Sequence, residues 1–418
     1  MTIHRRMLFA GLAGAGLAAA APAPAQDQTK PALREKLRKA VLEQRRPLAI
    51  DGTGVSGPGW DWLVAEGRAA HAFALGEDHG IAQVPVVAGA LMKALKPAGY
   101  SRMALEISPP VAPELDHAAR RGLEGLKAYY RQHPPGPAFY TMDAEARMLA
   151  EVRRAFPDQG PMFWGLDYEI VMDRRLIARL KSKAPPRAHP ALAALEKASR
   201  DAWAAFEAQR NPGLLFCFSG DPALVSAVQA AWRRPDPASA EILDTLRQSL
   251  VINQHQTARR YFQSNAARAA FNRANLVRRW RTEGGPKTLF KFGAGHMVRG
   301  RSMTEVYDLG ALIPEAAALA GGTSFHLLAI SGPGGRRAVF NPVAWTYDDT
   351  PSEGMAEMGL GFMSDLVFPQ GSTLVDLRPL RPLMPGSVTE TASPTLSRVV
   401  HGFDAVLLIG GATASKAL

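Results

Sequence analysis

The sequence predicts an α/β fold with a mainly parallel or mixed central sheet, flanking helices, and a helical insertion or cap. Short apolar runs alternate with polar turns and with segments whose apolar residues recur at helical spacing. Several of these helical segments are long enough to form crossovers between parallel strands. The 38 glycines and 32 prolines among 418 residues favour many turns, which argues against a bundle made of helices alone.

Residues 1–25 are typical of an export signal. Arg5 and Arg6 are followed by a Gly/Ala-rich apolar stretch over 7–21 and by a small-residue cleavage pattern that ends at Ala25. The arginine pair resembles a twin-arginine signal, and an ordinary Sec signal is the alternative. No later apolar run is long enough to span a bilayer. We therefore expect a periplasmic or secreted protein without stable membrane insertion.

The mature chain divides into four segments by pattern. An N-terminal segment of helix and loop covers 26–70, with loop over the Gly/Ser/Pro-rich residues 51–60. The α/β catalytic domain is expected in two parts, 71–187 and 286–418, separated by a helical insertion or cap over 188–285. Strands are expected at 71–75, 103–105, 161–166, 288–292, 325–330, 372–377 and 403–409, and helices at 32–43, 84–95 and 144–156.

Composition excludes several classes of protein. The formal net charge is +11, but the 49 basic residues are spread along the chain with no run of five, so a nucleic-acid groove is not expected. Cys217 is the only cysteine, which excludes an intramolecular disulfide and a Cys-rich zinc site. Its neighbours Phe216 and Phe218 are apolar, so we expect a buried thiol rather than a nucleophile.

Ionisable side chains stand where the predicted strands end. Because the carboxyl ends of parallel strands meet at one edge of a sheet, these side chains are expected to converge there. Asp167 and Glu169, which follow the third strand, are candidates for binding the substrate. The full set of strand-end residues is Glu77, His79, Glu106, Asp167, Glu169 and His296.

These motifs resemble those of erythromycin esterase-like proteins, whose wider superfamily includes the Tiki metalloproteases and the haem-binding ChaN-like proteins. The resemblance spans roughly residues 70–410. One departure is Ala269, which stands where the esterases have an Asp after the arginine. The matching elements are Gly76-Glu77-Asp78-His79-Gly80, Leu105-Glu106, Gly165-Leu166-Asp167, Arg268 with Asn275, Gly295-His296, and Phe403-Asp404-Ala405-Val406.

The economical reaction for these groups is hydrolysis by activated water, because no Ser-His-Asp arrangement and no plausible cysteine nucleophile is present. His79 is the expected general base, since a neutral imidazole accepts a proton near pH 7. Glu77 would hold the tautomer of the His79 imidazole, and Glu106 would complete the polarisation of the water. His296 and Arg268 are candidates to stabilise a developing oxyanion. The expected substrate is a small-molecule ester or amide, with no cofactor.

Two alternatives stay open at this point. His79, His296, Glu77 and Glu106 offer the nitrogen and oxygen donors that suit Zn or Mn, so a metal-dependent hydrolase or protease of the Tiki type is the second hypothesis. A haem-binding protein similar to ChaN is the third, with histidine as the haem ligand.

Overall fold

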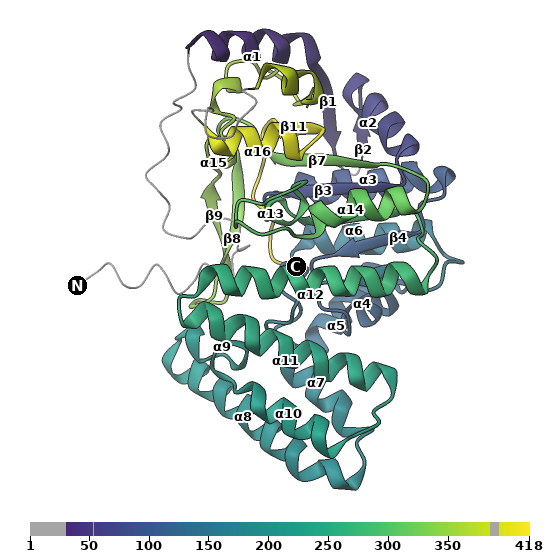
Figure 1. The fold of residues 1–418 in the computed structure, drawn as a ribbon, viewed down its shortest axis with the longest axis vertical. Helices are drawn as coiled ribbons and strands as arrows, with labels where there is room; N and C mark the ends of the chain where they lie inside the picture. The colour runs from purple at the N-terminus through teal and green to yellow at the C-terminus, as the bar shows by residue number, and fades with distance from the viewer. Residues whose placement is uncertain (1–30, 53, 385–392) are drawn as a thin grey trace, which may run out of the picture.

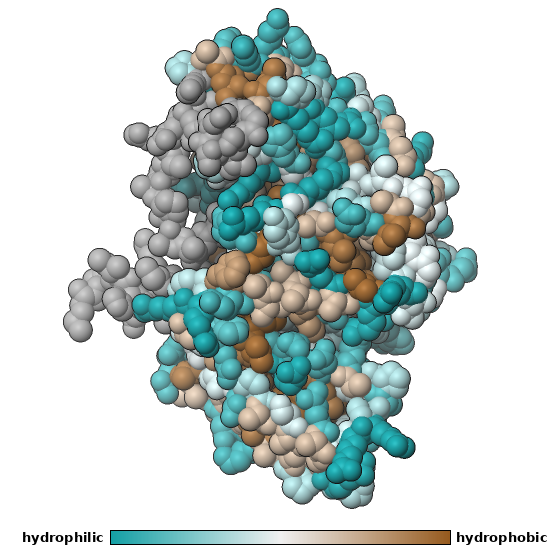
Figure 2. All heavy atoms as spheres, viewed as in Figure 1, coloured by the Kyte–Doolittle hydropathy of each residue, from teal (hydrophilic) through white to brown (hydrophobic). Residues whose placement is uncertain are grey.

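The computed structural model describes residues 31–52, 54–384 and 393–418. The export signal expected at 1–25 lies outside the described residues. In the part of the chain that is described, no helix is long and apolar enough to cross a membrane. The molecular face in Figure 2 carries separate hydrophobic patches among hydrophilic residues, as on ordinary globular proteins.

The described residues form an α/β fold around one nine-stranded mixed sheet, as predicted. The strand order is β2-β1-β10-β11-β7-β3-β6-β4-β5. The six strands from β11 to β5 are parallel, while β10, β1 and β2 add an antiparallel edge. The strands are β1 (Arg45–Asp51), β2 (Gly54–Ser56), β3 (Ala72–Glu77), β4 (Arg102–Leu105), β5 (Phe163–Gly165), β6 (Thr288–Gly293), β7 (Ser324–Ser331), β10 (Ser372–Asp376) and β11 (Ala405–Ile409).

Helices cover both faces of this sheet, so each central strand is buried on two sides (Figure 1). Along β3, Phe73 and Leu75 face one apolar core, while Ala72 and Ala74 face the other. The first core includes α2 (Pro58–Ala69), α3 (Gln83–Leu95), α4 (Ala112–Ala119), α5 (Gly122–Gln132) and α6 (Asp143–Ala155). The second includes α1 (Pro31–Gln44), α13 (Ala294–Met297), α14 (Leu309–Leu319) and α16 (Pro394–Gly402).

Between β5 and β6 the chain forms a run of helices, which lies below the sheet in Figure 1. Trp203, Phe206 and Phe271 of this layer are buried within the first apolar core, so the layer packs continuously onto the sheet domain. The helices are α7 (Asp173–Lys181), α8 (His189–Gln209), α9 (Phe216–Ser219), α10 (Pro222–Ala231), α11 (Pro237–Thr257) and α12 (Tyr261–Thr282).

The expectation of a loop over 51–60 is wrong. Most of this stretch belongs to β2, which pairs with β1 at the edge of the sheet, and to the start of α2. Glycine and proline obscured both elements, because Gly54 begins the short strand and Pro58 occupies the first turn of the helix, where proline is tolerated. A separate hairpin of β8 (Arg336–Asn341) and β9 (Thr346–Pro351) is present where no strand is predicted from the sequence.

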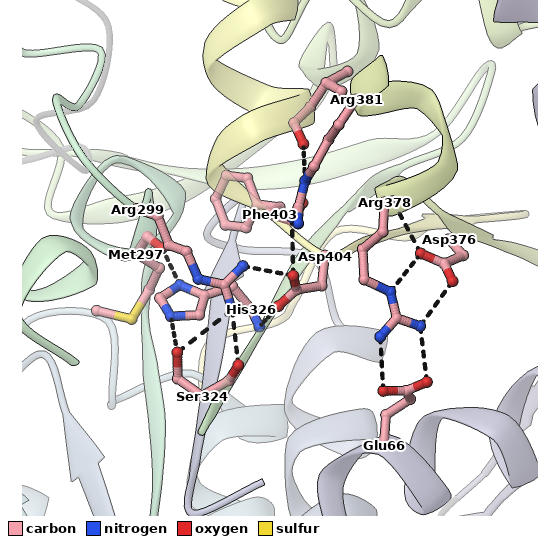
Figure 3. Close-up of polar contacts among 11 residues, drawn as sticks. Glu66, Met297, Arg299, Ser324, His326, Asp376, Arg378, Arg381, Phe403 and Asp404 are labelled. Carbon is pink, nitrogen blue, oxygen red and sulfur yellow. Dashed lines mark hydrogen bonds and ion pairs between the residues drawn. The ribbon is translucent and has the colours of Figure 1, made fainter. Parts of the chain in front are cut away.

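A charged network lies at the amino ends of β7 and β11 and connects these strands (Figure 3). Asp404, just before β11, accepts hydrogen bonds from the Arg299 and Arg381 guanidinium groups and from the His326 backbone N–H at 2.6, 2.9 and 2.8 Å. Burial, assisted by the positive charge of Arg299, lowers the pKa of His326 to about 3, so its imidazole is neutral. This network is structural, because it stands at the sheet edge opposite to the strand-end carboxylates.

Replacing Asp404 with alanine is expected to lower the free energy of unfolding by about 3 kcal/mol, because it leaves two arginines and a strand N–H without their acceptor. Urea denaturation followed by circular dichroism measures the change. Asp349→Ala is the matched control, since Asp349 pairs with Arg336 on the surface and its loss should remove less than about 1 kcal/mol. Equal losses in both variants would contradict a special role for Asp404.

Candidate functional site

The carboxyl ends of four adjacent parallel strands bring the predicted site residues together. Glu77 ends β3, and Glu106 follows β4 directly. Asp167 follows β5, and His296 lies in α13 after β6. The order β3-β6-β4-β5 makes these ends neighbours, so residues up to 219 positions apart in the sequence meet at one edge.

His79 lies between two carboxylates. Its Nδ1 is 2.7 Å from Glu77 Oε1, and its Nε2 is 3.2 Å from Glu106 Oε2. His79 Nε2 and Glu106 Oε2 are close enough to form an ion pair. Their geometry is not that of a hydrogen bond, however, and Nε2 has no other hydrogen-bond partner among the described residues. The Phe139 ring covers the imidazole in a stacked arrangement, with ring centroids 4.4 Å apart. The imidazole is thus fixed in place, with a buried Nε2 that faces Glu106 and has no hydrogen-bond partner in the described part of the chain.

His296 has a parallel arrangement. Its Nδ1 is 2.7 Å from Asp308 Oδ2, and its Nε2 is 3.6 Å from Glu106 Oε1. Asp308 is itself held at the start of α14, where its other oxygen accepts the Leu309 backbone N–H. Both histidines therefore bind a carboxylate through Nδ1 and turn Nε2 toward the same glutamate.

Arg268 reaches this edge from α12 of the helical layer. Its Nε donates to Asp167 Oδ1 at 2.9 Å, and its Nη2 donates to Glu106 Oε1 at 2.7 Å. Asn275, two turns later on the same face of the helix, donates to the backbone carbonyl of Leu166 at 3.0 Å. The helix thus fixes both the arginine and the loop after β5.

Lys291 and Glu145 belong to the site but were missed by the sequence analysis. Lys291 Nζ lies 2.8 Å from Glu77 Oε1 and 2.8 Å from Glu145 Oε1, and all three side chains are buried. Lys291 interrupts the apolar strand β6, and a charged residue in a buried strand is itself a signal of a functional or paired group. No such feature marks Glu145 in the sequence, because an acidic residue in the first turn of a helix, here α6, is common.

Gly293 ends β6 against the imidazole. Its backbone N–H donates to Glu106 Oε2 at 2.6 Å. A Cβ at this position would lie 2.9 Å from His79 Nε2, so any larger residue would displace the ring. The close approach of the strand therefore requires glycine here.

The surrounding carboxylates raise the pKa of both histidines. Burial disfavours the His79 imidazolium, but the ionised Glu106 and Glu77 outweigh it and raise the pKa of His79 to about 10. Burial and Arg268 oppose the charge on His296, while Asp308 and Glu106 favour it, and the net effect raises its pKa above 6.5. Burial raises the pKa of Glu106, but the two histidines and Arg268 hold it well below the usual range. At neutral pH His79 is therefore a cation beside an anion.

The two predicted substrate-binding carboxylates are already occupied by protein groups. Glu169 Oε1 accepts three successive backbone N–H groups at 2.9–3.0 Å, from Ile170, Val171 and Met172. Asp167 is bound by Arg268. These contacts favour a supporting role for both residues rather than direct contact with a substrate.

A small cavity of about 20 Å³ lies beside the cluster. Glu106, Asp167, Arg268 and Phe139 are among its lining residues. Its volume accommodates one water molecule, which would have polar partners on several sides. The cavity is therefore a suitable place for a reactant water next to the charged groups.

The side chains do not fit a metal centre. Within the described residues, no group of three or more His, Cys, Asp or Glu side chains is arranged to hold a metal ion. Glu106 already accepts Arg268 and the Gly293 N–H, and Glu77 already accepts Lys291. Two fixed cations thus occupy the carboxylates that a divalent ion would need.

Cys217 lies outside this cluster, on α9 of the helical layer, and is buried. Burial, together with the nearby charges of Asp173 and Glu169, raises the pKa of its thiol well above the usual value. The thiol is thus protonated, which agrees with the expectation that it is not a nucleophile.

Fold and site together define an α/β protein in which two carboxylate-bound imidazoles and an arginine surround one glutamate at the carboxyl edge of the sheet.

No protein-family profile and no curated protein matches the sequence. Solved structures do match over nearly their whole length. A Bacillus cereus protein superposes with a TM-score of 0.61 at 15% identity, covering 92% of this chain and 99% of its own.

Two further structures give similar values. A succinoglycan biosynthesis protein has a TM-score of 0.60 at 15% identity, with coverage of 93% of this chain and 100% of its own. A histidine-to-asparagine variant of the erythromycin esterase EreC, in its open conformation, has a TM-score of 0.59 at 14% identity, with coverage of 90% and 99%. The chain therefore has the fold of erythromycin esterase, as the motif resemblance implied.

Proposed function

We propose that this protein is a hydrolase of the erythromycin esterase-like type, which cleaves an ester or related bond with a histidine-activated water. The observation that supports the proposal is the convergence of two carboxylate-bound imidazoles, His79 and His296, on Glu106. Each carboxylate fixes the tautomer and orientation of its imidazole, which is the arrangement that proton transfer requires. The small cavity is lined by Glu106 and Arg268, so a water molecule there would contact the glutamate on which both imidazoles converge.

The charge states favour a division of roles that differs from the sequence expectation. A protonated imidazole cannot accept a proton from water, so the high pKa of His79 argues against His79 as the resting base. In the proposed mechanism His296 takes the proton, and the His79 imidazolium donates its Nε2–H to the developing oxyanion. Arg268 donates to Asp167 and Glu106 through Nε and Nη2, so in the proposed mechanism it positions Glu106.

The pH dependence of kcat/KM tests these roles. Activity should rise with pH as His296 loses its proton, with a midpoint above 6.5, and should fall as His79 loses its proton near pH 10. Hydrolysis of 4-nitrophenyl acetate across pH 5–11 gives the profile. His296→Ala should lose the ascending limb. A single ascent near pH 10 in the wild-type protein would instead return the base role to His79.

The remaining alternatives receive less support. A haem-binding site needs a histidine Nε2 open to a flat macrocycle, whereas both Nε2 atoms here face Glu106 in a buried cluster. The metal-dependent hydrolase lacks a fitting ligand set, as described above.

We also propose that the protein is exported, on the basis of residues 1–25 alone. Expression of the full chain in a bacterium with a twin-arginine pathway should yield periplasmic protein that starts near Gln26. N-terminal sequencing of the recovered protein measures this. An intact Met1 on cytoplasmic protein contradicts export, while export that persists after Arg5→Lys with Arg6→Lys assigns it to the Sec route.

A further inference from the structure

A groove of about 800 Å³ lies next to the charged cluster, and the proposed reaction does not account for it. It is bounded by the loop between α5 and α6, by the β8–β9 hairpin and by residues 417–418. This volume is typical of a site for a small organic molecule. Aromatic side chains dominate its walls, namely Tyr130, Phe139, Phe340, Trp345 and Tyr347.

Phe139 joins the groove to the catalytic cluster. Its ring lines the groove, stacks on His79, and also lines the small cavity beside Glu106 and Arg268. Its backbone is in the left-handed region with φ +66°, a conformation that is unusual for a bulky residue and common at ligand sites. A molecule seated in the groove would therefore be one aromatic ring away from the imidazole.

The charged side chains that line the groove are basic. Lys127 and Arg131 are among the lining residues, and no acidic side chain is. Glu124 pairs with Lys127 at 2.9 Å, but it lies outside the lining and its side chain is three-quarters exposed. Lys127 and Arg131 thus supply the charged side chains of the lining, so an apolar molecule that carries a negative charge is complementary to them.

We infer that this groove binds the non-reacting part of the substrate, and that this part is an apolar chain or ring system that ends in an anionic group. The inference rests on the proposed hydrolysis, because it places the scissile ester at His79 and the remainder of the molecule along the aromatic walls. Burial of each methylene against such walls favours binding, so longer acyl groups should react faster.

Three esters test the inference: 4-nitrophenyl acetate, 4-nitrophenyl octanoate and mono-4-nitrophenyl suberate. The wild-type kcat/KM should rise at least about 10-fold from acetate to octanoate, because the added methylenes enter the groove. The suberate monoester, which ends in a carboxylate, should exceed octanoate. Arg131→Gln should lower the suberate-to-octanoate ratio about threefold, the size expected for an exposed charge pair.

A blocking variant locates the effect. Thr346 is exposed and lines the groove, so Thr346→Trp should lower the octanoate-to-acetate ratio. Val343→Trp is the matched control, since Val343 is exposed on the turn of the same hairpin but outside the groove, and it should keep the wild-type ratio. Circular dichroism verifies the fold of both variants.

The outcomes separate the two proposals. If the wild type cleaves none of the three esters, the hydrolase proposal fails, and titration calorimetry with octanoate and suberate then tests binding to the groove alone. If acetate is cleaved and octanoate is no better, the groove proposal fails while the hydrolase proposal stands. An unchanged suberate-to-octanoate ratio in Arg131→Gln overturns the anionic part. The wild-type chain-length series decides the apolar part even if Thr346→Trp does not fold.

Discussion

His79→Ala is expected to lower kcat for ester hydrolysis by about 10²- to 10⁴-fold. The imidazolium supplies a positive charge and an Nε2–H beside Glu106, and an alanine replaces neither. This loss is expected whether His79 acts as the proton donor or as the base. The variant therefore tests whether His79 takes part in the reaction at all. Initial rates on a cleaved ester at pH 8 measure the effect.

The same variant is expected to lose some stability. The sequence places His79 in a loop, from which its removal would leave the core intact. In the structure, however, its loss leaves Glu77 and Glu106 with one cation fewer in a buried cluster, which typically reduces the free energy of unfolding by about 3 kcal/mol. Circular dichroism must therefore show a folded protein at the assay temperature before the rate is interpreted.

His71→Ala is the matched control. His71 stands just before β3 on the same chain segment, and its Nε2 contacts the Gly285 carbonyl rather than the charged cluster. Its replacement should leave the rate within about twofold of the wild type, as for other changes remote from the reacting groups. Near-wild-type turnover in folded His79→Ala would remove this residue from the mechanism.

The parallel strands were predictable because they are buried on both faces and appear in the sequence as continuous apolar runs. The order of the strands was not, since β3 lies between β6 and β7, which are more than 200 residues later in the chain. The hairpin β8–β9 was missed for a different reason. Most of its side chains are partly or fully exposed, so β9, with the sequence Thr-Tyr-Asp-Asp-Thr-Pro, shows no apolar run.

The site was predictable where a residue lies at the end of a strand or within a few residues after it. Glu77, Glu106 and His296 follow this rule, because the topology of a parallel sheet fixes where a strand-end residue lies. Asp308 and Phe139 do not, since each lies in a connection whose path depends on tertiary packing. The pairing of Lys291 with Glu145 depends likewise on a contact between residues 146 positions apart, which no local pattern encodes.

Glu106→Gln is expected to reduce kcat by about 10²- to 10³-fold, although the amide has nearly the same shape. The two carboxylate oxygens accept different donors, Arg268 Nη2 on Oε1 and the Gly293 N–H on Oε2. A glutamine has one acceptor oxygen, so its NH₂ group would face one of these donors and lose that hydrogen bond. The substitution also removes the negative charge that both imidazoles face.

The pH profile distinguishes this effect from simple loss of structure. Glu106 raises the pKa of His79, so its neutralisation should lower that pKa and move the descending limb of the profile from about 10 to lower pH. Glu151→Gln serves as the matched control, because Glu151 pairs with Lys93 near the surface, and its profile should overlay that of the wild type. A Glu106→Gln protein with wild-type turnover and an unmoved descending limb would show that the charge of Glu106 neither sets the protonation of His79 nor supports the reaction.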